Sequence, residues 1–187
     1  MLALFDGPIF GGRSALALDL VDASALLWRL ELLGVDVGAR WQPLADLWEA
    51  HADAGNYAFN DAHAMMAFVG AGRGTAVERV LAAQRRAMAE DTDNQRFTSE
   101  VGHPLCLAIQ AFAAGDPADC VRLIRPLRAI AQRFGGSHAQ RDLLDLTLLE
   151  AARRSGQGTL VRALVNERLQ LRPHSPQTRR LALRAAA

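Results

Sequence analysis

The chain contains the same short pattern twice, once near its start and once in its last third. Phe10–Ser14 (FGGRS) leads into Asp19–Leu26 (DLVDASAL), and Phe134–Ser137 (FGGS) leads into Asp142–Leu149 (DLLDLTLL). Self-similarity of this kind is typical of repeat proteins, in which each unit buries its apolar side against the next. We therefore predict a repeat architecture, which more often provides a binding surface than a catalytic centre.

Four glycines divide the chain at intervals of about 40 residues, a spacing typical of helical repeats. They are Gly34, Gly72, Gly115 and Gly156. Each one separates two stretches rich in Ala and Leu, in which apolar residues recur at spacings of three and four, the period of an amphipathic helix. Glycine adopts the positive φ that ends many helices, so each unit is predicted to be a helix, a glycine turn and a second helix.

The predicted fold is all-α, a right-handed α-α superhelix of about four helical hairpins plus a C-terminal end helix. One domain is expected to span residues 1–187. The hairpins are predicted at about 13–52, 60–91, 101–134 and 137–172, and the end helix at 177–186. Ser14 is the expected N-cap of the first helix. Pro126 is expected to kink the helix 117–133, and the segment 92–100 resists assignment to a helix.

Composition narrows the function classes. The net charge is +1, and half of the residues are hydrophobic, so there is no electrostatic reason to expect nucleic acid or an acidic membrane as a partner. No apolar run approaches the length of a membrane span, and the start lacks the features of a signal peptide. Cys106 and Cys120 are expected to be buried thiols in a reducing cytoplasm. No cofactor is predicted, and the absence of lysine excludes a Schiff base.

The helix–glycine–helix units resemble the tetratricopeptide repeat. The segments AFAAGDPADCVRLIRPL and EAARRSGQGTLVRALVNERLQLRPHSP are similar to divergent copies of it. The blocks GGRSALALDLVDASALLWRLEL, NDAHAMMAFVGAGR and FGGSHAQRD resemble the C-terminal part of the tetratricopeptide-repeat protein 38 family, including its bacterial members. The resemblance implies a helical scaffold and assigns no catalytic residue or cofactor. The units exceed the usual 34 residues and lack the usual Trp and Tyr signature, which puts a standard peptide groove in doubt.

The segment Gly7–Ser14 (GPIFGGRS) nearly matches a phosphate-binding P-loop. Such a loop follows a β-strand and carries a lysine that reaches the phosphates. Here Arg13 stands in the place of the lysine and no strand is predicted. We therefore interpret the glycines as a lead-in that lets the chain cross closely over neighbouring helices.

Two carboxylate pairs recur in equivalent repeats, Asp19/Asp22 and Asp142/Asp145. Residues three apart are neighbours on a helix face. Such pairs could serve acid/base chemistry or bind a metal. The alternative is that they cap loops or pair with Arg29 and Arg141, and their recurrence favours this structural role.

Histidines offer a second kind of candidate site. His63 lies beside Asp61, while His103 and His138 stand at helix starts. If successive helices bring them together, they could form a metal site or supply a general base. The alternative is that each is a hydrogen-bonded filler of the structure. Trp28, Trp41 and Trp48 are predicted to pack between helices of the first unit. The alternative is that they are exposed and stack against a ligand.

The predicted function is a non-catalytic interaction module that holds a protein or peptide on its concave face. The candidate partner-binding residues are Asp22, Arg29, His63, Arg73, His103 and Arg141. The alternative is a hydrolase-like or metal-binding enzyme that uses a His/Asp cluster around His63 and His103. A homodimer through the N-terminal hairpin is also expected, since Leu16, Leu18 and Leu20 would be incompletely covered at the end of the array.

Overall fold

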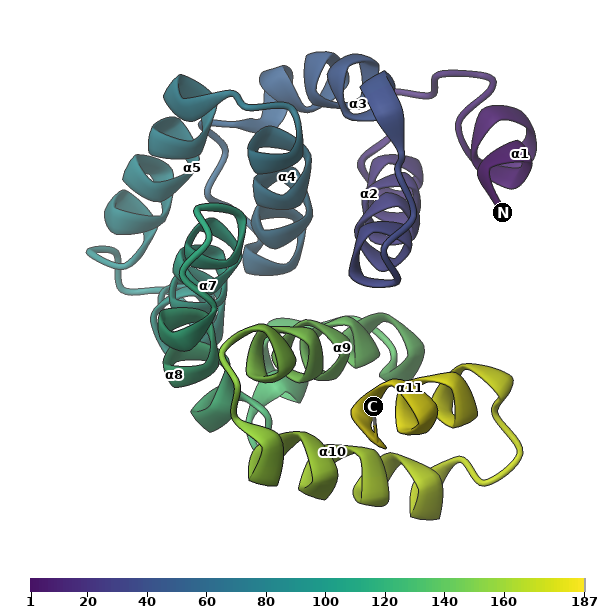
Figure 1. Ribbon diagram of the computed structural model, residues 1–187. Helices are drawn as coiled ribbons and strands as arrows, with labels where there is room; N and C mark the ends of the chain where they lie inside the picture. Colours follow the sequence, from purple (N-terminus) through teal and green to yellow (C-terminus); the bar gives the residue numbers. More distant parts are fainter. Residues whose placement is uncertain (187) are drawn as a thin grey trace.

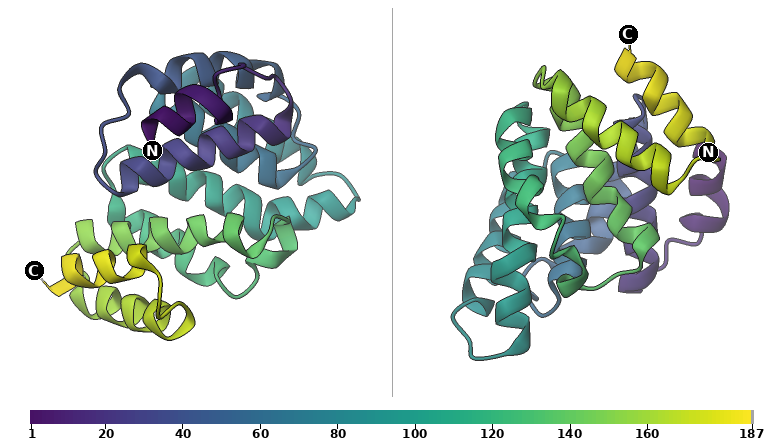
Figure 2. Two further views of the ribbon diagram at one scale, coloured as in Figure 1. Left: turned by 90° about the vertical axis from the view of Figure 1, so that its right-hand side faces the viewer. Right: turned by 90° about the horizontal axis from the view of Figure 1, so that it is seen from below.

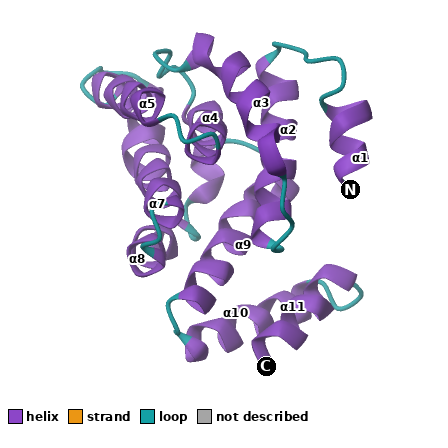
Figure 3. Cartoon of the chain, turned by 45° about the horizontal axis from the view of Figure 1, so that its top comes forward, coloured by secondary structure: helices purple, strands orange, loops and turns teal. Residues whose placement is uncertain are grey.

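The computed structural model describes residues 1–186 and, of these, the side chains of 1–184. Within these residues every regular element is helical and no strand occurs, which confirms the all-α prediction (Figure 3). The hairpin helices are α2 (Ala17–Leu32) with α3 (Trp41–Trp48), α4 (Ala58–Gly70) with α5 (Gly74–Ala87), α7 (His103–Ala113) with α8 (Pro117–Leu127), and α9 (His138–Arg154) with α10 (Gly158–Leu171). The end helix is α11 (Pro176–Ala186).

The four predicted glycine turns lie where one hairpin helix gives way to the next, and all four have the same geometry. Gly34, Gly72, Gly115 and Gly156 have φ of 79°, 70°, 80° and 71°. In each turn the N–H of the residue after the glycine donates to a carbonyl five residues earlier, as from Val35 to Leu30 and from Arg73 to Phe68. This is the Schellman motif, which satisfies carbonyls left free at a helix end.

The first helix of each hairpin lies on the inside of the arc that the chain describes (Figure 1). Helix α4 packs against α2 and α7, and α2 also packs against α9. The first and fourth hairpins therefore touch, although most of the chain separates them in sequence. This contact fills the inside of the arc with side chains.

Trp28 is central to this closure. Its ring is buried and tilted against Phe112 of α7 with centroids 5.6 Å apart, while its Nε1 donates to Thr147 Oγ1 of α9 at 2.9 Å. The prediction that Trp28 packs within the first unit was therefore wrong. Trp41 and Trp48 do bond within that unit, where their Nε1 atoms donate to Glu31 at 2.7 Å and to Ser24 at 2.9 Å. The ring of Trp41 also packs against Gly70 of α4, in the second hairpin, where a Cβ would collide with it.

Several local predictions need correction. The first hairpin helix starts at Ala17 and has Leu16 as its cap residue; Ser14 Oγ instead accepts from the Leu16 N–H at 3.2 Å. The chain before it is also helical, as α1 (Leu2–Leu4) followed by a π-helical turn, Phe5–Ile9.

The segment 92–100, which was not expected to be helical, contains α6 (Asp93–Phe97) and the start of a π-helical turn, Thr98–Gly102. Thr92 explains this start, because its side chain accepts the N–H of Gln95 as an N-cap.

Pro126 does not kink a longer helix. Helix α8 ends one residue after it, at Leu127, and the 3₁₀ turn Ala131–Phe134 follows.

None of the helices in the described part of the chain has the length and apolar character required to cross a lipid bilayer.

Candidate binding pocket

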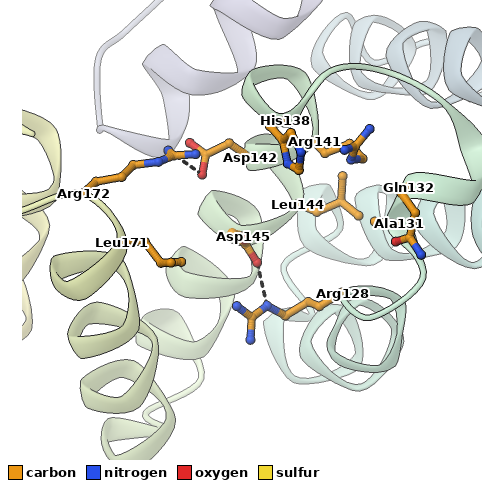
Figure 4. Close-up of a pocket in the computed structure, with 10 residues that line it drawn as sticks. All are labelled: Arg128, Ala131, Gln132, His138, Arg141, Asp142, Leu144, Asp145, Leu171 and Arg172. Atoms are coloured by element: carbon orange, nitrogen blue, oxygen red, sulfur yellow. Dashed lines mark hydrogen bonds and ion pairs between the residues drawn. The ribbon is translucent and has the colours of Figure 1, made fainter.

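A charged pocket of about 370 Å³ opens where α8, α9 and the end of α10 meet (Figure 4). The lining residues are Arg128, Ala131, Gln132, His138, Arg141, Asp142, Leu144, Asp145, Leu171 and Arg172. Arg141 is the one predicted partner-binding residue among them. Three arginines and a histidine face two carboxylates here, so the lining carries an excess of positive charge.

The start of α9 positions the upper side of the pocket. Ser137 and Gln140 form a capping box, in which the Ser137 hydroxyl accepts the N–H of Gln140 at 3.3 Å and the Gln140 side chain accepts the N–H of Ser137 at 2.8 Å. Gly135 and Gly136 precede it with φ of 98° and 75°. A Cβ at either glycine would collide with Tyr57 or Phe59. This second Phe-Gly-Gly copy therefore lets the chain cross closely over the start of α4.

Both carboxylates of the pocket are held by arginines. Asp145 accepts from Arg128 Nε at 2.6 Å, and Asp142 accepts from Arg168 at 2.6 Å and from Arg172 at 2.9 Å. Burial alone would raise the pKa of Asp142, but the hydrogen bonds from the two arginines outweigh it and the pKa lies below its usual value. The carboxylate pair therefore organises arginines, although its partners differ from the predicted Arg29 and Arg141.

Arg141 retains hydrogen-bonding capacity. Its Nη1 donates to the carbonyls of Gly135 and Gly136, which anchors one side of the guanidinium. Its Nε and Nη2 donate no hydrogen bond to any residue that the structure describes. His138, one turn earlier on the same helix, is exposed at the pocket edge. The pocket thus combines an anchored guanidinium with an accessible imidazole at the positive end of a helix dipole.

His63 does not lie on an open face. Its side chain is 2% exposed, its Nδ1 is 2.8 Å from the Phe59 carbonyl, and its ring lies against that of Phe59 with centroids 4.5 Å apart. Burial lowers the pKa of His63 to about 4, so the imidazole is neutral at pH 7. Its Nε2 has no hydrogen-bond partner among the described residues.

Asp61 belongs to a separate polar cluster with Gln84, Cys106 and His103, of which His103 is half-buried and the others are buried. Gln84 joins them, since its Nε2 is 3.3 Å from Asp61 Oδ2 and from Cys106 Sγ, and its Oε1 is 3.1 Å from His103 Nδ1. Burial raises the pKa of Asp61 to about 6 and lowers that of His103. Asp61 and His103 therefore meet through an intervening amide, while His63 lies outside the cluster.

The other predicted residues are spread over the molecule. Arg29 donates to the carbonyls of Ala25 at 3.2 Å and Ala139 at 2.8 Å, and so ties α2 to the start of α9. Arg73 pairs with Asp46 and Glu49 at the junction of α3 with α5. Asp22 is exposed on α2. The structure thus does not bring the six residues together on one face.

The sequence pattern grouped His138 with His63 and His103, and it gave no signal that Arg128 and Arg172 would lie beside it. The second Phe-Gly-Gly motif marks the start of α9 and hence the place of His138. The contributions of Arg128 and Arg172 depend on how α8 and α10 pack around α9, which no local pattern encodes.

The P-loop-like segment also has a structural explanation. A helical turn, Phe5–Ile9, leads into it and includes its first three residues, in place of a strand. A Cβ at Gly11 would lie 2.6 Å from the carbonyl oxygen of Gly7, so glycine is required there for the chain to fold back on itself. The prediction that these glycines let the chain cross closely over neighbouring helices is therefore wrong for this segment, because Gly11 approaches only the segment's own backbone and Gly12 has free space around it.

Among the described residues, no three His, Cys, Asp or Glu side chains are grouped so that they could hold a metal ion. Both cysteines, Cys106 and Cys120, are free and buried, and burial raises the pKa of each thiol.

No family model matches the chain, and no solved structure gives a significant match to it.

Proposed function

We propose that the chain is a non-catalytic interaction module that binds an acidic segment of a protein or peptide in the pocket at the start of α9. The observation that carries this proposal is that the guanidinium of Arg141 and the imidazole of His138 both line the pocket, where each can donate a hydrogen bond. A carboxylate that enters could accept a charge-assisted hydrogen bond from Arg141, the stronger class of such bonds.

The finer architecture is part of the same proposal. We infer a right-handed superhelix of the tetratricopeptide type, related to the C-terminal part of the tetratricopeptide-repeat protein 38 family and located in the cytoplasm. The support is the recurrence of one Schellman turn in four hairpins at a spacing of about 40 residues. Because the α2–α9 contact fills the inside of the arc, the proposed partner docks beside α9 and not along a continuous concave groove.

The alternative, an enzyme built on His63, Asp61 and His103, has less support. His63 is enclosed and bonded to its own helix, and Gln84 separates Asp61 from His103. A general base must reach the proton that it abstracts, directly or through one water. The geometry of these three residues therefore favours structural roles.

A peptide selection tests the proposed function. A random 12-residue peptide library is displayed on phage and selected on the immobilised chain, and enriched peptides are measured by fluorescence anisotropy against the wild type and Arg141→Ala. We expect enriched peptides to carry Asp or Glu. Arg141→Ala should weaken their binding about tenfold or more, which corresponds to one charged hydrogen bond.

The matched control is Arg162→Ala, which removes an exposed arginine of α10 whose side chain bonds to Thr159 of the same helix, at 3.2 Å. This variant should bind the peptides as the wild type does. The proposal would be refuted if no peptide is enriched relative to selection on an empty support. It would also be refuted if Arg141→Ala binds the enriched peptides as tightly as the wild type does.

A further inference from the structure

A second, mostly apolar groove of about 650 Å³ lies beside the C-terminal end of α2, on the side of the molecule where both ends of the chain lie (Figure 2). It is formed by the start of the chain, the C-terminal end of α2 with the turn after it, and α11; both end helices lie on the right-hand side of Figure 1. The lining residues are Met1, Leu2, Ala3, Leu30, Leu33, Val35, Arg180 and Arg184. The groove shares no residue with the charged pocket at α9.

The two arginines of the groove stand one helical turn apart on α11. Residues four apart lie on the same helix face, so both guanidinium groups can reach one anionic group. Neither the lining nor the sequence of α11 contains a carboxylate that could pair with them. In this respect the groove differs from the pocket at α9, where Asp142 and Asp145 already hold arginines.

The remaining lining is entirely aliphatic or thioether. No neutral side chain with a hydrogen-bonding group faces the groove. A peptide laid into it would leave its N–H groups without side-chain acceptors, and buried polar groups without partners are costly. An alkyl chain has no such groups and covers exposed apolar surface, including that of Met1 (70% exposed) and Val35 (37% exposed).

We propose that this groove binds a single-chain carboxylate amphiphile of the fatty-acid type. The alkyl chain lies along Leu2, Leu33 and Val35, and the carboxylate accepts hydrogen bonds from Arg180 and Arg184. Guanidinium and carboxylate match in geometry and charge. The volume falls in the range of small-ligand sites, which is about 300–1,000 Å³. The inference is independent of the proposed peptide function.

Calorimetric titration of the full chain with dodecanoate, below its micelle concentration, tests the proposal. Octanoate and dodecylammonium serve as comparison ligands. Each methylene buried contributes about 0.8 kcal/mol, or about fourfold in affinity, so octanoate should bind far more weakly than dodecanoate. Dodecylammonium has the same chain with the opposite charge and should bind at least about tenfold more weakly.

Two double variants separate the head-group contact from bulk charge. Arg180→Gln/Arg184→Gln should weaken dodecanoate binding about tenfold or more. Arg162→Gln/Arg179→Gln removes the same net charge from exposed positions that do not line the groove, and should leave dodecanoate binding within about twofold of the wild type. Circular dichroism and thermal unfolding establish that each variant is folded.

Val35→Glu supplies a test that does not depend on removing arginines. Val35 lies in the turn after Gly34 and is partly exposed, so a glutamate should be tolerated there and should compete with the ligand for the two guanidinium groups. We expect loss of dodecanoate binding and unchanged peptide binding at the α9 pocket. The proposal is overturned if the wild type does not bind dodecanoate, if dodecylammonium binds as well, or if Arg180→Gln/Arg184→Gln binds like the wild type.

Discussion

Two buried titratable side chains of α4, Asp61 and His63, should respond to pH in opposite directions. The pKa of Asp61 is raised from 3.8 to about 6, so its protonated form is favoured in the folded state. Its contribution to stability is fully present below pH 3.8 and is lost as the pH rises through 6. The pKa of His63 is lowered from 6.5 to about 4. Its contribution is present above pH 6.5 and is lost as the pH falls through 4.

Replacing Asp61 should therefore remove its pH-dependent contribution to stability. We expect the free energy of unfolding of Asp61→Asn to exceed that of the wild type at pH 7. The pKa shift converts to a difference on the order of 3 kcal/mol, because one pKa unit corresponds to about 1.36 kcal/mol. The difference should shrink as the pH falls toward 4. Urea unfolding between pH 4 and pH 7, followed by circular dichroism, measures this difference.

His63→Asn is the complementary variant, because its amide can occupy the place of Nδ1 near the Phe59 carbonyl. Relative to the wild type it should gain stability as the pH falls from 7 to 4, with an offset from the lost ring contacts. A pH-independent difference between wild type and Asp61→Asn would show that the Asp61 carboxylate is not desolvated in the folded protein.

At the scale of the elements, the glycine turns are the feature that recurs in all four hairpins. Gly72 needs its positive φ of 70°, whereas Gly74, two residues later at the start of α5, has no such requirement and has free space around it. The same substitution should thus have different effects at two neighbouring positions. This contrast separates the strain of a left-handed backbone from the general effect of adding a methyl group.

Gly72→Ala should lower the free energy of unfolding by about 1 kcal/mol or more, because alanine at positive φ is strained. Gly74→Ala should change it by less than about 0.5 kcal/mol, or raise it, because alanine reduces the entropy of the unfolded chain. Denaturant unfolding of the two variants provides the measurement. Equal destabilisation by both would contradict the assignment of the turn.

At the scale of the whole molecule, Trp28 and Thr147 join the first and fourth hairpins across 119 residues of sequence. In an open array each unit contacts only its neighbours, whereas this contact couples the ends. A double-mutant cycle with Trp28→Phe and Thr147→Val should give a coupling energy of about 1 kcal/mol for the buried hydrogen bond. A coupling energy of zero would mean that the two hairpins do not meet there in solution.

The exposed apolar residues at the start of α2 bear on assembly. Leu16 and Leu18 are 70% and 68% exposed, whereas Leu20, which was also expected to be under-covered, is fully buried. We predict self-association through this hairpin, driven by burial of the two leucines. Sedimentation velocity should show a dimer that becomes monomeric in Leu16→Ser/Leu18→Ser. A monomer at high concentration in the wild type would refute the predicted homodimer.

Much of the helical architecture could be predicted because its signals are local. The glycines at 34, 72, 115 and 156 mark helix ends, since positive φ is open to glycine without strain. The errors arose where local signals were weak or had two outcomes. Thr92 was missed as a cap, so α6 was not expected. Pro126 can kink or end a helix, and here the helix ends.

The candidate site could be predicted only in part. Arg141 was identified, but its neighbours Arg128 and Arg172 come from two other helices and meet it through packing. His63 was expected to contact a partner because it lies on the first helix of a hairpin, which was predicted to line the concave face. It is buried instead, since α4 is enclosed by α2, α3 and α7.

The sequence by itself determined that the chain is helical and where its hairpins turn, because helix periodicity and glycine dihedral preferences act over a few residues. Only the tertiary structure decided that α2 returns to α9, that Trp28 reaches Thr147, and that the charged pocket and the apolar groove are separate surfaces. The path of an array is the sum of small packing angles between successive helices. Each angle depends on side chains from both helices, so no single segment encodes which distant residues meet.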